Sequence, residues 1–263
     1  SAADASVTWV DRADTATGGL EKMDLTRNGE YAEDSLDANW TESIYIVQAN
    51  SNVTITGDLT VGMNTTIILC DNSTLKVTGS LNVAASGACI FGQTSTHQAE
   101  DAGKLIVQNT VDAGAAVRST SGYGLSIYGG SMELHGGTSK QLTDNVGLYS
   151  KGSNGTIMKG TRDGEALTLD KWDGVQALMG SKLVLEYCEH DDEDTEYVHD
   201  EGANTHHLHC NACGLDYRSE ACNFEYGDVV NAGAEGHRRS CWCGNQESTL
   251  TEHTFISVPT RDG

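Results

Sequence analysis

The feature that most constrains the fold is a series of very short apolar units, in each of which one residue separates two aliphatic side chains. The units recur at intervals of only about six to eight residues, with Asn, Asp, Gly and Ser between them. The first six are Ile44/Ile46, Val53/Ile55, Leu59/Val61, Ile67/Leu69, Leu75/Val77 and Leu81/Val83. Each unit alternates, which predicts a strand with one buried face. Such short strands favour a β-solenoid, in which stacked coils bury a continuous core.

The same kind of unit continues through the middle of the chain. Later units are Leu105/Val107, Leu125/Ile127, Met132/Leu134, Leu167/Leu169 and Leu183/Leu185. Gly-Gly pairs at 129–130 and 136–137 mark turns between coils. A β-sandwich is the competing interpretation, but its turn signals would come about every 8–12 residues. We therefore predict an all-β chain with a parallel β-helix over 44–187, preceded by a cap or lead-in segment over 1–43.

Several stretches of this region follow a running pattern. They are NVTITG at 52–57, IILCDNSTL at 67–75, IFGQ at 90–93, GKL at 103–105 and IYGG at 127–130. Over roughly 44–137 the chain resembles a family of right-handed parallel β-helix modules from large secreted or wall-attached proteins of Gram-positive, often gut-dwelling, bacteria. The resemblance implies a right-handed helix in a bacterial protein that is secreted or held at the cell surface. It also implies a Cys/His module after the helix, and it fades beyond residue 137.

One Cys/His pattern is written twice in the last third of the chain. The first copy reads His206-x3-Cys210-x2-Cys213-Gly214, and the second reads His237-x3-Cys241-x-Cys243-Gly244. A Cys or a His follows each copy, two places before a Phe. Zinc binds four Cys or His ligands in a tetrahedron, often two of them from a tight Cys-x2-Cys turn. The pattern predicts two zinc-stabilised repeats over 188–263, at approximately 188–222 and 222–255.

The ligand sets can be assigned in two ways. The local assignment gives a first site of His206, Cys210, Cys213 and Cys222, and a second site of His237, Cys241, Cys243 and His253. In the alternative, Cys188, with or without His190, replaces Cys222, which passes to the second site and leaves His253 free. The local assignment closes shorter loops, so it is favoured.

Both sites are expected to be structural, because thiolate-rich sets with no open position do not suit catalysis. The segment from 188 to 263 also has few aliphatic residues, so a metal ion would supply its folding energy. Three further histidines, His199, His207 and His209, are expected to be exposed rather than to bind metal. Disulfides are the less favoured alternative, since they would not require His at matched spacing.

Charge and hydropathy limit the partners of the chain. The formal net charge is -22, which makes nucleic acid and anionic membrane surfaces poor partners. Since no apolar run reaches about 18 residues, no membrane insertion is expected. The sequence begins at Ser1 rather than at Met, which predicts a removed signal peptide and a secreted or cell-surface location. The chain is also expected to belong to a larger modular protein.

The function predicted from these features is a non-enzymatic extracellular surface module: an adhesin, a stalk or a glycan-contacting β-helix. Its expected partners are host or plant glycans or a surface protein, with Tyr123, Tyr128 and Trp172 exposed for stacking on sugars. The alternative is a polysaccharide lyase or glycoside hydrolase of the β-helix type, which needs carboxylates that converge on one coil face. The candidates for that role are Glu133, His135, Asp163, Asp170 and Asp173.

Overall fold

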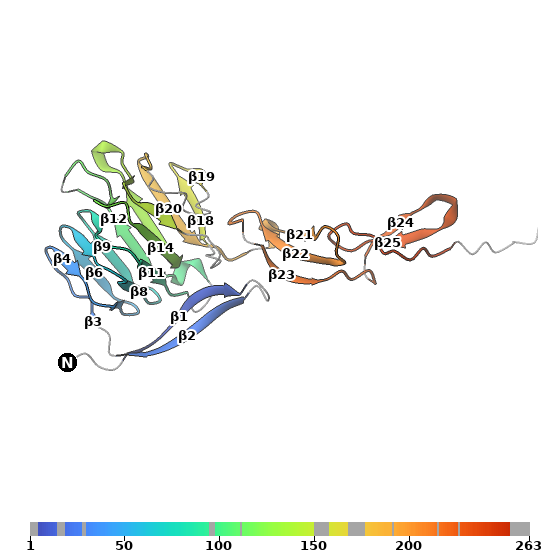
Figure 1. Ribbon diagram of the computed structural model, residues 1–263, viewed down its shortest axis with the longest axis horizontal. Helices are drawn as coiled ribbons and strands as arrows, with labels where there is room; N and C mark the ends of the chain where they lie inside the picture. Colours follow the sequence, from blue (N-terminus) through green and yellow to red (C-terminus); the bar gives the residue numbers. More distant parts are fainter. Residues whose placement is uncertain are drawn as a thin grey trace, which may run out of the picture.

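In the computed structural model the chain is all-β, and a β-solenoid of about five turns precedes two small antiparallel sheets (Figure 1). The described residues are 5–14, 19–27, 30–94, 98–110, 112–149, 158–167, 177–190, 192–214, 216–225 and 227–252. The predicted β-helix followed by Cys/His modules is therefore confirmed as a fold class.

Three sheets run along the solenoid, and successive coils add one parallel strand to each. Sheet I contains β4 (Ala38–Trp40), β7 (Leu59–Val61), β10 (Leu81–Val83), β13 (Val117–Arg118) and β16 (Thr143–Asp144). Sheet II contains β3 (Glu30–Tyr31), β5 (Ile44–Val47), β8 (Thr66–Leu69), β11 (Ala88–Gly92), β14 (Gly124–Gly129) and β17 (Gly147–Tyr149). The parallel strands of sheet III are β6 (Asn52–Ile55), β9 (Thr74–Val77), β12 (Lys104–Val107) and β15 (Ser131–His135).

The core consists of aliphatic columns that follow from this register. The columns are Leu59–Leu81–Val117 in sheet I, Ile67–Ile90–Ile127 in sheet II and Leu75–Leu105–Met132 in sheet III. All nine side chains are at most 2% exposed. Full burial of such a side chain contributes about 1.5–3 kcal/mol relative to exposure, so the solenoid is stabilised by its own core.

Polar residues form the turns between the strands. At the entry to sheet I, Asp37 Oδ1 accepts a hydrogen bond from the Asp58 amide, and Asp58 Oδ1 accepts one from the Ser80 amide, both at 2.8 Å. At the turn from sheet II to sheet III, Asn50 and Asn72 have φ values of 60° and 57° in successive coils. Asn tolerates this left-handed conformation better than most residues. Each turn is thus repeated from coil to coil, as the core columns are.

The outer face of sheet II is also apolar. Ile46, Ile68, Phe91 and Tyr128 lie side by side on it, and the rings of Phe91 and Tyr128 stack at 4.8 Å. The antiparallel hairpin of β1 (Ala5–Asp14) and β2 (Gly19–Arg27) lies against this sheet, where β1 contacts β11 and β14. The expectation of an exposed Tyr128 is therefore wrong, because its ring is partly buried. Tyr123 is also half-buried and packs against the core, and Trp172 lies outside the described residues.

The solenoid departs from the predicted pattern at both ends. Parallel pairing already includes β3 and β4, before the expected start at residue 44, because strands of two or three residues are too short to show alternation. At the other end, β20 (Lys182–Tyr187) pairs antiparallel with β15. β18 (Met158–Arg162) then pairs antiparallel with both β20 and β19 (Glu165–Leu167). The units at Leu167 and at Leu183/Leu185 therefore do not form additional parallel coils. Alternation indicates which side chains are buried, but it does not indicate the direction of the strand.

Two small antiparallel sheets follow the solenoid and extend away from it (Figure 1). Module one is the sheet of β21 (Thr195–His199), β22 (Thr205–Cys210) and β23 (Asp216–Ala221). Module two is the hairpin of β24 (Val229–Asn231) and β25 (His237–Arg239). Four 3-10 turns occur among the described residues: η1 (Ala99–Asp101), η2 (Gly137–Ser139), η3 (Asp192–Asp194) and η4 (Gly233–Glu235). In the described part of the chain, no helix has the length and apolar character needed to cross a membrane.

Candidate metal centres

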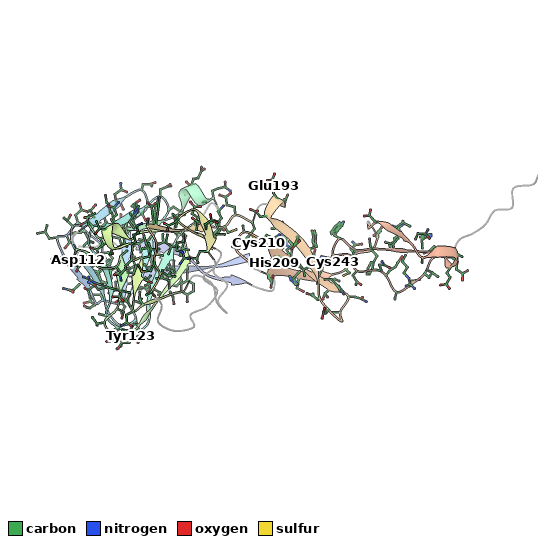
Figure 2. The ribbon with its side chains drawn as sticks, turned by 90° about the horizontal axis from the view of Figure 1, so that it is seen from above. Asp112, Tyr123, Glu193, His209, Cys210 and Cys243 are labelled. Atoms are coloured by element: carbon green, nitrogen blue, oxygen red, sulfur yellow. The ribbon has the colours of Figure 1, made fainter. Side chains whose placement is uncertain are left out.

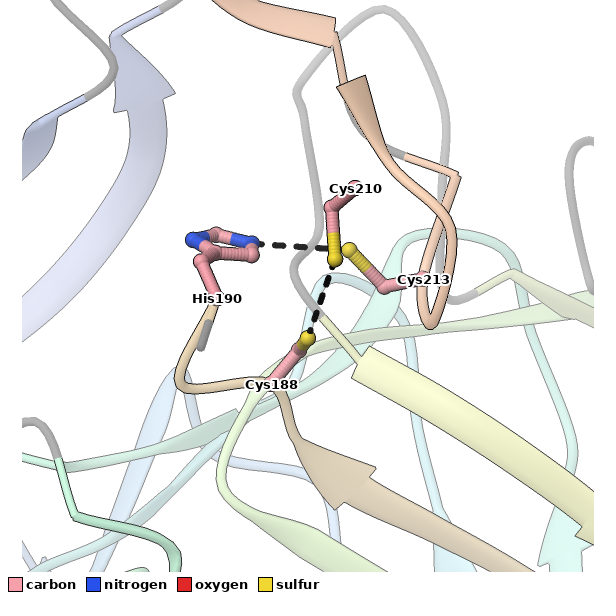
Figure 3. A group of neighbouring side chains, drawn as sticks. All are labelled: Cys188, His190, Cys210 and Cys213. Atoms are coloured by element: carbon pink, nitrogen blue, oxygen red, sulfur yellow. Dashed lines mark hydrogen bonds between the residues drawn. The ribbon is translucent and has the colours of Figure 1, made fainter. Parts of the chain in front are cut away.

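The first Cys/His cluster lies where the solenoid meets module one. It consists of Cys188, His190, Cys210 and Cys213, and each residue places one ligand atom within 4.8 Å of the others. The Sγ atoms of Cys188 and Cys210 are 3.6 Å apart, and His190 Nε2 is 3.4 Å from Cys213 Sγ (Figure 3). All three cysteines are buried, at 5% exposure or less. Because Cys188 directly follows β20 and Cys210 ends β22, this cluster connects the last solenoid strand to module one.

Local backbone geometry brings these ligands together. His190 has a φ of 55°, and this left-handed conformation reverses the chain two residues after Cys188. Gly214, with a φ of 72°, closes the Cys210-x2-Cys213 turn by donating its amide to the Cys210 carbonyl at 2.6 Å. Side chains larger than hydrogen rarely adopt such a φ, which explains the Gly after the second cysteine. Tyr187, Ala102 and Leu208 pack around the cluster from both sides of the junction.

The second cluster lies between module one and module two. It consists of His206, Cys222, Cys241 and Cys243. His206 Nδ1 is 3.3 Å from Cys241 Sγ, and the Sγ atoms of Cys222 and Cys243 are 3.7 Å apart. His206 belongs to β22 and Cys222 follows β23, whereas Cys241 and Cys243 lie in the turn after β25. Figure 2 shows Cys210 nearer the solenoid and Cys243 farther out along the modules.

His206 is held in an orientation that suits a metal ligand. Its side chain is only 1% exposed, and the ring of Tyr197 meets it edge-on at 4.9 Å. Its Nε2 lies 3.2 Å from Glu220 Oε1, so Nε2–H can donate to the carboxylate while Nδ1 faces the cysteines. A carboxylate behind a histidine in this way fixes the ring and its tautomer at many metal sites.

The residues of both clusters fit a tetrahedral metal ion. With metal–sulfur and metal–nitrogen bonds of the usual zinc lengths, ligand atoms in a tetrahedron lie about 3.3–3.8 Å apart. The four contacts given above fall between 3.3 and 3.7 Å. Either cluster could therefore hold a metal ion with no side chain moving far.

The thiols themselves also favour a cation in each cluster. Burial raises the pKa of Cys222 to about 11, and burial with the neighbouring Cys188 raises the pKa of Cys210. In contrast, the hydrogen bond with Cys213 lowers the pKa of Cys188 to about 6. Burial alone would raise the pKa of Cys241, but hydrogen bonds with the backbone of Cys243 and Asn223 lower it to about 7. Each cluster thus contains one thiol with a raised pKa beside one with a lowered pKa. A divalent ion would allow all of them to ionise, because metal binding displaces thiol protons.

The structure groups the predicted ligands differently from the local assignment. Cys222 lies with the second pair of cysteines rather than with Cys210, and His206 lies with them too. The alternative assignment put Cys188, with or without His190, beside Cys210 and moved Cys222 to the second site, and the structure groups these residues in the same way. Both assignments kept His206 in the first site, whereas the structure places it in the second cluster. Four residues of strand span about 13 Å, so His206 and Cys210 on the same face of β22 cannot bind the same ion.

The other histidines that the structure describes lie outside both clusters. His237 lies outside both groups, and His253 lies outside the described residues. His207 Nδ1 is 2.6 Å from Asp200 Oδ1, and His209 Nδ1 is 2.5 Å from Asp216 Oδ1. His199, His207 and His209 are half-buried rather than exposed as predicted. His206, Leu208 and Cys210 alternate along the buried face of β22. This alternation distinguishes the cluster residues His206 and Cys210 from His207 and His209, which lie on the other face.

The two carboxylates considered for catalysis that the structure describes, Glu133 and Asp163, are held by cations and by backbone amides. Glu133 lies 2.7 Å from His135, 3.4 Å from Lys104 and 3.3 Å from Lys182. Burial alone would raise its pKa, but His135 and the two lysines together lower it. Asp163 accepts hydrogen bonds from the backbone of residues 181 and 182, and Asp170 and Asp173 lie outside the described residues.

The comparisons with known proteins found no match for the chain. It matches no model of a known protein family, no curated protein and no solved structure. The solenoid and the two Cys/His clusters are therefore the basis for an inference about function.

Proposed function

We propose that this chain is a non-enzymatic module of a bacterial surface protein, in which two structural zinc ions connect a β-helix to two small Cys/His modules. Three cysteines and one histidine in each cluster form a ligand set typical of zinc. Each cluster supplies all four ligands from protein side chains, so a bound zinc ion would have no open position for a substrate. This geometry supports structural rather than catalytic metal sites.

The observation that carries the proposal is that each cluster takes its ligands from two consecutive units. The first joins the end of the solenoid to module one, and the second joins module one to module two. β22 contributes to both, since it supplies His206 to the second cluster and Cys210 to the first. Zinc at both positions would hold the three units in one fixed line, as a stalk or an extended binding surface requires.

Two further features support a surface role over an enzymatic one. A general acid that protonates a leaving group needs a raised pKa, whereas the neighbours of Glu133 lower its pKa. The location outside the cell rests on the resemblance of residues 44–137 to secreted and wall-attached β-helix modules. Long solenoid faces also suit extended ligands such as glycans.

The proposal is tested by elemental analysis of the purified chain combined with small-angle X-ray scattering. We expect about two zinc ions per molecule and an elongated particle of one shape. Removal of zinc with a chelator should broaden the distribution of shapes, because the modules then lose their fixed connection to the solenoid. Circular dichroism should show that the β-solenoid remains folded.

Two results would contradict the proposal. A metal content near zero, with mass spectrometry showing disulfides between cluster cysteines, would exclude structural zinc. Release of oligosaccharides from a panel of mucin and plant glycans would show an enzyme instead. Binding to such glycans without any cleavage product agrees with a surface module.

A further inference from the structure

A groove of about 690 Å³ runs along the outer face of sheet I. Its polar lining includes Thr60, Asn82, Arg118, Ser119, Asp144 and Asn145. The exposed methyl group of Ala84 lines it as well, next to Val83, whose side chain faces the core. A volume of this size lies within the range of known small-ligand sites, which is about 300–1,000 Å³.

The register of the solenoid arranges the groove as a ladder. Thr60 pairs with Asn82, Asn82 with Arg118, and Arg118 with Asp144, each on the next coil. Neighbouring strands lie about 4.8 Å apart, so one polar side chain is presented at each such step. This step is comparable to the length of one sugar unit in an extended polysaccharide. The ladder thus repeats along the groove as the units of a linear glycan do.

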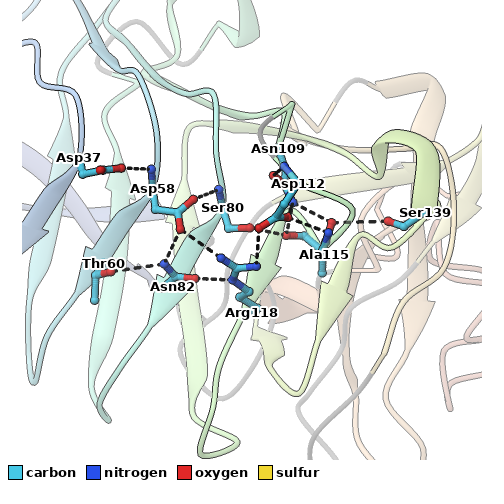
Figure 4. A network of polar contacts seen from close by, with 11 residues as sticks. Asp37, Asp58, Thr60, Ser80, Asn82, Asn109, Asp112, Ala115, Arg118 and Ser139 are labelled. Carbon is cyan, nitrogen blue, oxygen red and sulfur yellow. Dashed lines mark hydrogen bonds and ion pairs between the residues drawn. The ribbon is translucent and has the colours of Figure 1, made fainter.

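Arg118 is held rigidly at the centre of this ladder (Figure 4). Its Nε donates to Asn82 Oδ1 at 2.7 Å, and its Nη2 and Nη1 pair with Asp58 and Asp112 at 3.0 and 3.2 Å. Asn82 Nδ2 in turn donates to Thr60 Oγ1 at 3.3 Å. Fixed side chains lose little conformational entropy on binding, so these contacts prepare the groove for a ligand.

Asp144 supplies the groove with free hydrogen-bonding capacity. Its side chain is exposed and makes no hydrogen bond or ion pair with any residue in the described ranges. The next residue, Asn145, donates its Nδ2 to the Ser119 carbonyl at 2.7 Å, which leaves its Oδ1 as an acceptor. Acceptors from Asp and Asn beside a guanidinium donor can bind pairs of neighbouring hydroxyl groups.

The charges around the groove decide between ligand classes. The Arg118 guanidinium pairs with Asp58 and Asp112, and Asp144 adds a third carboxylate to the groove. The net charge of these four groups is negative, so an anionic chain would be repelled. Two of these carboxylates already pair with Arg118, which leaves no cluster of free carboxylates for a cation. A neutral, hydroxyl-rich chain fits both the polar ladder and the small apolar contact of Ala84.

We infer that the outer face of sheet I binds a neutral linear glycan, with Asp144 and its neighbours on the ladder as the contacting residues. The inference deepens the proposed surface function and rests on it. The other two outer faces are less suited, because the β1–β2 hairpin lies against sheet II, and Glu133 pairs with Lys104 and Lys182 on sheet III. None of the lining residues is aromatic, so we expect weak binding with a Kd of about 1 mM.

The test uses isothermal titration calorimetry and amide chemical shifts of the full chain with four hexasaccharides. Three are neutral β-1,4-linked chains of glucose, mannose or xylose, and the fourth is the acidic hexagalacturonate. We expect at least one neutral chain to bind and to shift the amides of residues 60, 82 and 119, with no binding of hexagalacturonate. Asp144→Ala should weaken binding about tenfold, as the loss of hydrogen bonds to a charged group predicts.

Glu186→Ala is the matched control, because Glu186 is an exposed carboxylate on the outer face of sheet III. It should bind the neutral chain as the unmodified protein does. The inference is overturned if no neutral chain binds, if Asp144→Ala binds equally well, if shifts map to sheet III or if hexagalacturonate binds more tightly. Cleavage of a bound chain would contradict the non-enzymatic function but would support glycan binding in the groove. Two bound zinc ions without any glycan binding would support the proposed function but would contradict glycan binding in the groove.

Discussion

The solenoid and the C-terminal modules solve the same stability problem by different means. In the solenoid, every sheet contributes aliphatic side chains that are at most 2% exposed to one continuous core. Among the described residues of modules one and two, the buried side chains are His206, Leu208, Cys210, Cys213 and Cys241. A segment with so little apolar burial needs another source of folding free energy. Metal ions bound at the two Cys/His clusters would play in the modules the role that the aliphatic columns play in the solenoid.

The solenoid and the modules also differ in how their neighbouring units are joined. Coils of the solenoid are connected by backbone hydrogen bonds and by turn residues such as Asp37 and Asp58. The modules are connected by ligands from both sides of each junction, and Tyr197 also contacts the ring of Trp242 at 5.3 Å. Loss of a single ligand should thus disconnect a whole module, whereas loss of a core side chain should weaken the solenoid gradually.

The largest effect is expected from His206→Ala. Removal of this ligand should lower the zinc content from about two ions to about one. Replacing a residue that only contacts a metal ligand lowers metal affinity by up to about 100-fold, so losing a ligand itself should lower the affinity of the second cluster by more. Since structural zinc supplies about 10–16 kcal/mol in small zinc modules, module two should unfold. Elemental analysis and limited proteolysis check this outcome, with cleavage expected in β24–β25 and the solenoid intact.

His207→Ala is the matched control for this variant. His207 is the next residue of β22 but faces Asp200 instead of the cluster. It should keep about two zinc ions and a protease-resistant module two. If both variants lose the same amount of zinc, or if His206→Ala frees module one from the solenoid instead, the grouping of His206 with Cys241 is incorrect.

A smaller effect is expected from Leu105→Ala in the solenoid core. Leu105 is 1% exposed, and truncation of such a side chain costs about 2–5 kcal/mol in free energy of unfolding. Thermal unfolding should show a lower midpoint for the solenoid, while the zinc content stays at about two ions. Ile106→Ala, at the next and half-buried position of β12, should cost clearly less. Loss of zinc in Leu105→Ala would show that the two regions do not fold independently.

Much of the solenoid could be predicted from the alternation of its short apolar units. Alternation identifies inward residues such as Leu75 and Leu105 because the side-chain period of a strand is two. The apolar outer face of sheet II was missed, although Ile67-Ile68-Leu69 is continuous rather than alternating. Such a run indicates a strand buried on both faces. The antiparallel end at β20 could not be predicted, since strand direction depends on the path of the connecting chain.

The ligands could be predicted as a set but not fully as two groups. The Cys210-x2-Cys213 turn is local, so spacing alone identifies it. The grouping of His206 with Cys241 depends on the register of β22 against β23 and on the position of module two. Loop length favoured the nearer partner, whereas strand geometry separates residues four positions apart. Alternation within THHLHC at 205–210 would have shown that His206 and Cys210 share a face at a distance.

The smallest effect is expected from Glu133→Gln on sheet III, and it sharpens the comparison by showing what polar contacts add to a stable core. The pairs of Glu133 with Lys104 and Lys182 are partly exposed, so their loss should cost only about 1 kcal/mol at pH 7. The pKa of Glu133 is lowered in the folded state, so its stabilisation is complete above the unfolded pKa of about 4.3 and is lost as the pH falls through the folded value. Urea unfolding at pH 7 and at pH 3 should therefore show a difference between variant and parent that shrinks in acid. Glu186→Gln should show little difference at either pH, and a Glu133→Gln difference that grows in acid would mean that the lysines do not stabilise the carboxylate.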